Sequence, residues 1–501
     1  MDIALPFPEQ RLFFTTGRNE GVGLEAIDRL NLRPAILARY RDLNRLRYDF
    51  PLVLVSDGVE AGTIRSLSSV IDEVLAEIAP RGLEGERLRK HVLRLEREIR
   101  TMTAEGMRGL LSELWTMAAS KLASSDDPSA KEVLAHIAGK LKLDGEVVDC
   151  EPSMIARVCE HLWRAAQQRK ATAFLALVER LVVRLSDILR AAFIHSEAGQ
   201  RPDALRASLG GSHRRAFDFD VMSKLVTRNV SKDELSASRR MRLERTLAVL
   251  NSQRFFDDPR LRNGADAKDV FDFRFDDCAA AAEAFRARLT ALTAVVKAIA
   301  IAELEAAGRY VENQHDAFFE HFDAGSLSAD DLGLFPDYFV WVASGRTGAS
   351  ANTGLMDVLS AGLPVKVLVE TTDLVEEAAV GTGHFAFGVR STRLANTATG
   401  LGGVFVVQAT SAHLCALRER IERAFAHRGP ALLSIYVGTE RFSSALPPYL
   451  GTAAAMESRA FPAFTYDPYA GDNQAARFSL EDNPQPEADW PVDTLEYADE
   501  N

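Results

Sequence analysis

The residues best suited to metal or redox chemistry are four cysteines that lie far apart in the chain: Cys150, Cys159, Cys278 and Cys415. An iron–sulfur cluster needs thiolates at short, characteristic spacings, and neither a CxxC nor a ferredoxin-type spacing occurs. The chain therefore cannot hold such a cluster with its own thiolates. The small number of cysteines is typical of a protein in a reducing cytoplasm, which is the location we expect.

Two other groups of residues could suggest a metal site. Cys159 and His161 are two positions apart on a predicted helix, so their side chains diverge and cannot share an ion. We expect a core cysteine and a surface histidine. The acidic pairs at 218–220 and 276–277 could attract a divalent cation, but neither has a third ligand at a defined spacing. Helix capping is the better interpretation of both pairs.

The common catalytic motifs are missing from the sequence. It contains no Walker lysine loop, no His-Glu-x-x-His and no Gly-x-Ser-x-Gly. The glycines at 381–388 have the wrong spacing for a dinucleotide fingerprint, and those at 400–403 precede a predicted strand rather than a helix. His384 and His413 lie near predicted strand ends, where we interpret them as structural.

The composition excludes several classes of protein. A chain of 501 residues is too long for one ordinary core and indicates two to four domains. Its net charge of −12 argues against a general nucleic-acid or anionic-membrane binder. We see no signal peptide in the first ten residues, and no apolar run approaches the roughly 20 residues needed to span a bilayer.

The elements that would position a site lie between residues 337 and 438, where short apolar runs alternate with stretches of helical length. Strands that alternate with helices predict an α/β fold with a parallel sheet, and any ligand crevice is expected at the carboxyl ends of the strands. The predicted strands are Asp337–Ala343, Pro364–Glu370, Gly403–Gln408 and Ala431–Val437, and the predicted helices are Asn352–Ala361, His384–Ala398 and Ser411–His427.

The rest of the chain is predicted to be mainly helical. We expect an extended N-terminal arm at 1–62, a large all-α region at 63–325, the α/β domain at 326–470 and an acidic tail at 471–501. Leucine, valine and isoleucine spaced three and four apart between 88 and 117 form a seam typical of helix packing.

Charged residues cover the faces of two predicted helices. The opposite face of the helix that begins at Glu86 mixes both signs, so we interpret it as solvated rather than as a binding helix. The cluster Arg239, Arg240, Arg242 and Arg245 is also expected to be a solvated face.

The segment Gly354–Asp373, GLMDVLSAGLPVKVLVETTD, resembles the thiamine-diphosphate-binding domain of pyruvate:ferredoxin (2-oxoacid:acceptor) oxidoreductases. In that family a helix ending in glycine leads to a strand of the Val-x-Val-Leu-Val type and then to the cofactor loop. The resemblance covers roughly residues 335 to 485, about a third of the chain. Its other blocks are 401–408, 429–436, 457–468 and 477–482.

The sequence departs from the family at the metal ligands. The family binds Mg²⁺ with the Asp of a Gly-Asp-Gly and with a later Asn, and these positions fall on Ser344 and Glu377 here. A serine hydroxyl is a poor ligand for Mg²⁺, which prefers hard oxygen ligands in a near-octahedral array. Gly345 is retained. Thr372 and Asp373 complete the positions at which the resemblance places the degenerate cofactor site.

Three functions remain open from the sequence. The first is a non-catalytic or accessory module of a 2-oxoacid oxidoreductase system, with no cofactor on this chain. The second is an active thiamine-diphosphate enzyme with Mg²⁺ held by altered ligands. The third is a regulatory or interaction protein that binds another anionic ligand near 345–348. We expect a homo-oligomer or a subunit of a larger oxidoreductase complex, with no nucleic-acid or membrane partner.

Overall fold

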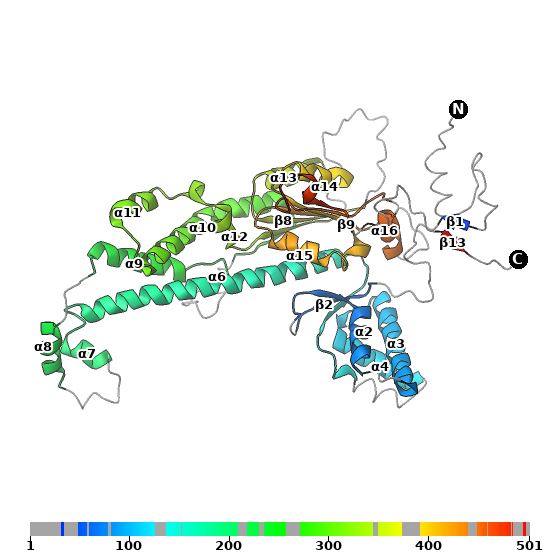
Figure 1. The fold of residues 1–501 in the computed structure, drawn as a ribbon, viewed down its shortest axis with the longest axis horizontal. Coiled ribbons are helices and arrows are strands. Elements are labelled where there is room, and N and C mark those ends of the chain that lie inside the picture. Colours follow the sequence, from blue (N-terminus) through cyan, green and yellow to red (C-terminus); the bar gives the residue numbers. More distant parts are fainter. Residues whose placement is uncertain are drawn as a thin grey trace. The chain divides into compact units, whose positions relative to one another are not determined.

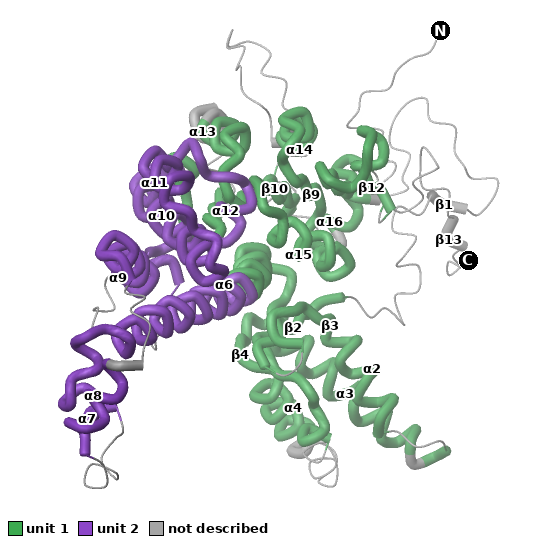
Figure 2. The backbone as a smooth tube through the Cα atoms, turned by 60° about the vertical axis from the view of Figure 1, so that its left-hand side comes forward, with its two compact units in different colours: residues 1–167, 274–281, 337–501 green, residues 168–273, 282–336 purple. Residues whose placement is uncertain are grey.

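The chain is a mixed α/β protein (Figure 1). The computed structural model describes residues 32–34, 49–57, 60–78, 82–125, 137–151, 153–208, 218–229, 235–256, 271–343, 349–372, 391–438, 448–457, 459–481, 483 and 494–496. The chain divides into two compact units (Figure 2). Unit 1 contains residues 1–167, 274–281 and 337–501, and unit 2 contains residues 168–273 and 282–336.

A seven-stranded sheet forms the main part of unit 1, in the order β12-β11-β9-β10-β8-β7-β6. Its parallel strands are β6 (Arg274–Phe275), β7 (Tyr338–Val342), β8 (Val365–Thr371), β10 (Ala431–Tyr436) and β9 (Phe405–Thr410). The antiparallel strands β11 (Phe464–Tyr466) and β12 (Phe478–Ser479) extend the sheet beyond β9.

The four predicted strands of this sheet are confirmed to within one or two residues. Strands β8, β9 and β10 are buried along their whole length, and only Trp341 is exposed in β7. Burial on both faces explains why these strands read as continuous apolar runs rather than as alternating patterns. The α/β class follows from this sheet.

Helices cover both faces of the sheet (Figure 1). On one face lie α13 (Ala349–Ser360) and α14 (Ser391–Thr399). On the other lie α15 (Arg418–Ala426) and the first turns of α6 (Met154–His195), where Phe339 of β7 contacts both Phe425 and Trp163. The prediction of a helix that begins at Ser411 is wrong, because residues 411–413 form the 3₁₀ turn η5 and the α-helix starts seven residues later.

The beginning of unit 1 contains a second sheet, which corrects the prediction that residues 63–325 are all-α. The antiparallel order is β3-β2-β5-β4, built from β2 (Leu52–Val55), β3 (Ile64–Ser66), β4 (Gly109–Leu110) and β5 (Gly145–Val148). It shares a core with α2 (Leu67–Ile78), α3 (Leu83–Ala104) and α4 (Leu111–Ser125). Strands this short carry little periodic signal.

The predicted domain boundaries do not coincide with the two units, because strand pairing joins distant segments. Strand β2 lies in the predicted arm but pairs with β3 and β5. Strand β6 lies in the predicted helical region but pairs with β7. A separate two-stranded pair joins β1 (Leu32–Pro34) to β13 (Thr494–Glu496). The α16 helix (Pro448–Glu457) and the η7 turn (Ala475–Arg477) complete unit 1.

Unit 2 is helical in its described residues. Phe335 contacts Phe174 of α6 and Phe255 at ring-centroid distances of 5.5 and 4.7 Å, and these rings form part of its core. The other elements are α7 (Pro202–Ser208), α8 (Phe219–Asn229), α9 (Ala237–Asn251), α10 (Cys278–Ala306, whose first turn is in unit 1), α11 (Glu312–Glu320), η4 (Ala324–Ser326) and α12 (Ala329–Gly333).

The arginine cluster on α9 is only in part the solvated face that its sequence predicts: Arg240 and Arg245 are exposed, whereas Arg239 and Arg242 are partly buried and paired. The guanidinium groups of Arg239 and Arg242 lie 2.8 and 2.9 Å from the two carboxylate oxygens of Glu305 on α10. Glu305 is buried, and burying a carboxylate is costly unless it is paired in this way. No helix among the described residues is both long enough and apolar enough to cross a membrane.

Candidate functional site

The carboxyl ends of β7, β8, β10 and β9 lie at one edge of the large sheet and define its candidate site. The chain leaves β8 toward α14 on one face, whereas it leaves β9 toward α15 on the other face. β10 lies between these two strands, although it follows both in sequence. In open α/β sheets, ligands bind outside the carboxyl ends at such a reversal of strand order.

A row of polar side chains crosses the sheet at this edge. Thr371 of β8, Tyr436 of β10 and Thr410 of β9 are direct neighbours in the parallel register, so their side chains share one face, opposite to the face on which Phe339 packs against α15. The hydroxyls of Thr371 and Thr410 are buried and have no hydrogen-bond partner in the described structure. The hydroxyl of Ser434, two residues before Tyr436, is also buried and has no hydrogen-bond partner in the described structure.

Unsatisfied buried hydroxyls are unusual, because each loses its hydrogen bonds to water on folding. Thr371, Thr410 and Ser434 can each donate or accept a hydrogen bond. These three hydroxyls lie on one face of the sheet, with Thr371 and Thr410 on either side of Tyr436 and Ser434 two residues back from the end of β10, and each has unused capacity for a polar partner or ordered water.

A carboxylate occupies the opposite face of the same strand end. Glu370 is buried, and one of its oxygens accepts a hydrogen bond from the indole N–H of Trp341 at 3.0 Å. Cys159 of α6 lies close enough to Glu370 for the charge of this carboxylate to affect the pKa of its thiol. Burial first, and then the charge of Glu370, raise the pKa of the Cys159 thiol far above its usual range. Cys159 is thus the core cysteine that the sequence predicts, and it stays protonated.

Hydroxyls also connect α16 to the end of β9. The Ser411 hydroxyl donates to the Thr452 hydroxyl at 3.2 Å, and Thr452 in turn donates to the carbonyl of Tyr449. The Cys150 sulfur lies 3.9 Å from the Ser411 oxygen, and burial raises the pKa of the Cys150 thiol to about 12. A protonated thiol is a weak nucleophile, so Cys150 is a packing residue here.

Of the five residues that the resemblance places in the cofactor site, the structure describes Thr372, which is partly buried directly after β8. Ser344, Gly345, Asp373 and Glu377 lie outside the described residues, as does His384. The flanking strands β7 and β8 are adjacent and parallel, with Val342 opposite Val369. The two segments that carry these residues therefore leave the sheet from neighbouring strand ends.

Sequence reasoning missed Trp341, Thr371, Thr410 and Ser434 as members of this site. Their signal is a polar or indole side chain inside an otherwise apolar strand. His413 is buried at the end of β9, as expected of a structural histidine. The described residues contain no group of three or more His, Cys, Asp or Glu side chains that could hold a metal ion.

A second polar cluster lies at the opposite, amino end of the strands. The Lys366 ammonium is fully buried and donates to the carbonyls of Gly429, at 2.7 Å, and His427. Its charge is matched by Asp337, which accepts a hydrogen bond from Gln167 at 3.1 Å. Burial, and then the charge of Lys366, lower the pKa of His427 to about 4. Every member is engaged in packing, so this cluster stabilises the sheet.

Comparison with known proteins gives no family assignment. A scan against protein-family models finds no match to this chain, and a search of curated proteins finds no significant match.

Proposed function

We propose that this chain is a non-catalytic or accessory module of a 2-oxoacid:acceptor oxidoreductase system, built on a scaffold like a thiamine-diphosphate-binding domain. The observation that carries the proposal is that the resembling blocks come together in one sheet. Block 354–373 supplies α13 and β8, block 401–408 supplies β9 and block 429–436 supplies β10. The trailing blocks supply β11 and β12 at the edge beside β9.

The non-catalytic part of the proposal rests on the chemistry of the strand end. A thiamine-diphosphate site must neutralise a diphosphate, and Mg²⁺ does this with hard oxygen ligands. The positions that the resemblance assigns to the metal hold Ser344 and Glu377. Glu370 adds a buried negative charge on the strand that leads into the cofactor loop. Negative charge near a diphosphate repels it, so these residues do not fit the cofactor.

An accessory module needs other chains to supply the cofactor and the redox centres. We therefore propose that the chain works in the cytoplasm, either as a subunit of a larger complex or as a homo-oligomer. An active enzyme with Ser344 and Glu377 or Asp373 as altered metal ligands is the alternative under the same resemblance.

A second candidate function is regulation by a small polar or anionic ligand. The observation that favours it is that the buried hydroxyls of Thr371, Thr410 and Ser434 lie on one face of β8, β9 and β10 without a partner in the described structure. Replacement of Thr410 by Val keeps the shape and removes one hydroxyl. Loss of ligand binding in this variant, with no change in assembly, would favour the second function.

The test is to purify the full chain from its own cells under mild conditions and assay 2-oxoacid-dependent reduction of a viologen dye. We expect dye reduction from a complex that contains this chain and none from the chain alone. Iron and flavin contents of the two samples give a second readout. A purified chain that reduces the dye without partners would contradict the accessory role, and a complex with no 2-oxoacid activity would contradict the proposed system.

A further inference from the structure

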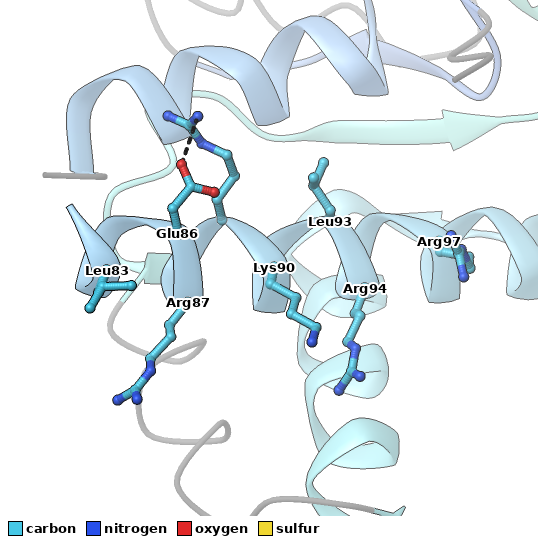
Figure 3. Close-up of a pocket in the computed structure, with 8 residues that line it drawn as sticks. Leu83, Glu86, Arg87, Lys90, Leu93, Arg94 and Arg97 are labelled. Atoms are coloured by element: carbon cyan, nitrogen blue, oxygen red, sulfur yellow. Dashed lines mark ion pairs between the residues drawn. The ribbon is translucent and has the colours of Figure 1, made fainter. Parts of the chain in front are cut away.

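The exposed face of α3 carries an open groove of about 710 Å³ (Figure 3). The buried face of this helix is the predicted seam, in which Val92, Leu95 and Ile99 are fully buried. The groove lies along the remaining surface of the helix. It is lined by five basic residues, one acid and two leucines: Arg87, Arg89, Lys90, Arg94, Arg97, Glu86, Leu83 and Leu93.

Folding separates the charges that the sequence intermixes. Glu96 is buried and pairs with Arg100 at 3.0 Å, while also accepting a hydrogen bond from Ser68. Glu98 is mostly buried and pairs with Lys121 of α4. These two acids are therefore paired with residues outside the groove lining, and the one acid in the lining, Glu86, pairs with Arg89 at 3.7 Å.

A row of positive charges is formed by Arg87, Lys90, Arg94 and Arg97, and we name it the α3 stripe. Their spacing of three, four and three places them on one side of the helix, and Figure 3 shows Arg87, Lys90 and Arg94 extending from that side. None of the four forms an ion pair in the described part of the chain. Like charges at these spacings destabilise an isolated helix.

The lining also contains apolar surface. Leu83 is 84 % exposed and Leu93 is 39 % exposed, both next to the stripe. Three of its four cations are arginines, whose planar guanidinium groups bind carboxylates with two parallel hydrogen bonds. An occupant that matches this groove carries several carboxylates on one side, together with one or two apolar side chains.

We propose that the α3 stripe is a docking surface for an acidic, leucine-containing segment of a partner protein. The stripe runs from residue 87 to 97, about 15 Å of helix, which suits a short peptide segment. A nucleic acid or an anionic membrane presents charge over a much larger area. This proposal does not depend on the proposed function.

The test measures binding of a fluorescein-labelled peptide of glutamate, aspartate and leucine to the full chain by fluorescence anisotropy. The variant is Arg87→Gln, Lys90→Gln, Arg94→Gln and Arg97→Gln together. The matched control replaces four exposed arginines of α6 by Gln, which changes the net charge equally: Arg169, Arg180, Arg184 and Arg190. Circular dichroism confirms that each variant is folded.

We expect the α3 variant to bind the peptide roughly tenfold or more weakly, the α6 control to bind like the unmodified chain, and added salt to weaken binding. A peptide with glutamine and asparagine in place of the acids should not bind. Equal binding by the α3 variant and the control would overturn the proposal. So would tighter binding of a single-stranded oligonucleotide, or of vesicles containing phosphatidylserine, that is lost in the same variant.

Discussion

The ammonium nitrogen of Lys366 lies 3.8 Å from a carboxylate oxygen of Asp337, and neither side chain is exposed. Lys366 is in β8, and Asp337 directly precedes the neighbouring strand β7. A buried lysine within a parallel strand could be mistaken for a catalytic residue. Its position at the amino end, with carbonyl partners from His427 and Gly429, shows instead a structural charge pair in the core.

Removal of one member of this pair should strongly destabilise the protein. Lys366→Met leaves the Asp337 carboxylate buried without its counter-ion, which costs about 3–5 kcal/mol of unfolding free energy. The double variant Lys366→Met with Asp337→Asn should be less destabilised than Lys366→Met. Urea unfolding measures both, with the exposed Arg184→Met as a control expected within about 0.5 kcal/mol of the parent. A Lys366→Met loss similar to that control would show that the pair is not buried in solution.

His427 should make stability fall on acidification. Its pKa is about 4 in the folded chain, below the usual value of 6.5, because burial and Lys366 disfavour the imidazolium. The unfolded chain therefore binds more protons between these pH values, so the stabilisation is complete above pH 6.5 and is lost as pH falls toward 4. The full shift of the pKa corresponds to a maximum of about 3.4 kcal/mol.

The check for His427 is urea unfolding as a function of pH, compared with His427→Gln. The variant should show a flatter dependence between pH 6.5 and 4, apart from the carboxylates that titrate in both proteins. A direct NMR titration should place the His427 pKa near 4. A midpoint near 6.5 would mean that the imidazole is solvated and that the packing at Gly403 and Lys366 is wrong.

The four cysteines should react slowly with thiol reagents in the folded protein. Burial is the first cause of a raised pKa at each of them, which lowers the thiolate fraction at neutral pH. The pKa of Cys415 is raised the least of the four, to about 11. Mass spectrometry after brief iodoacetamide treatment should show little labelling at pH 7.5 and full labelling in urea. A rapidly labelled cysteine would be an activated thiol, and rapid labelling at Cys150 would contradict its packing role.

The Trp341–Glu370 hydrogen bond should contribute to stability at the strand ends. Trp341→Phe removes the indole donor from a buried carboxylate, so we expect a loss of about 1–3 kcal/mol in urea unfolding. Glu370→Gln keeps an acceptor and removes the charge. Combining it with Trp341→Phe should reduce the penalty of the Trp341 change. If Trp341→Phe costs the same in both backgrounds, the hydrogen bond does not form in solution.

The sheet was predictable because its central strands are buried on both faces and therefore appear as apolar runs, as in β8 and β10. The four-stranded sheet was not predictable. Its strands β4 and β5 are two and four residues long, and they pair with distant segments. The contact of Arg242 with Glu305 likewise joins residues of two helices 63 positions apart, which no local pattern indicates.

The candidate site was only partly predictable for the same reason. Glu370 and Thr372 follow directly from the end of a predicted strand. The row formed by Thr371, Tyr436 and Thr410 requires knowing that β10 inserts between β8 and β9. Sequence order alone places β9 beside β8. Glu96 and Glu98 are paired with residues outside the α3 stripe, and this pairing also depends on other helices, through Ser68 and Lys121.

The proposed accessory role predicts that the site at Ser344 and Glu377 does not hold thiamine diphosphate. The most direct measurement is the melting temperature of the full chain titrated with thiamine diphosphate and Mg²⁺. A ligand at one hundred times its Kd stabilises by about 2.7 kcal/mol, so binding would be visible. We predict no shift for the unmodified chain, and none for Ser344→Asp, because Glu377 remains. A clear shift that is lost in Ser344→Ala or Glu377→Gln would contradict the account and favour the active enzyme.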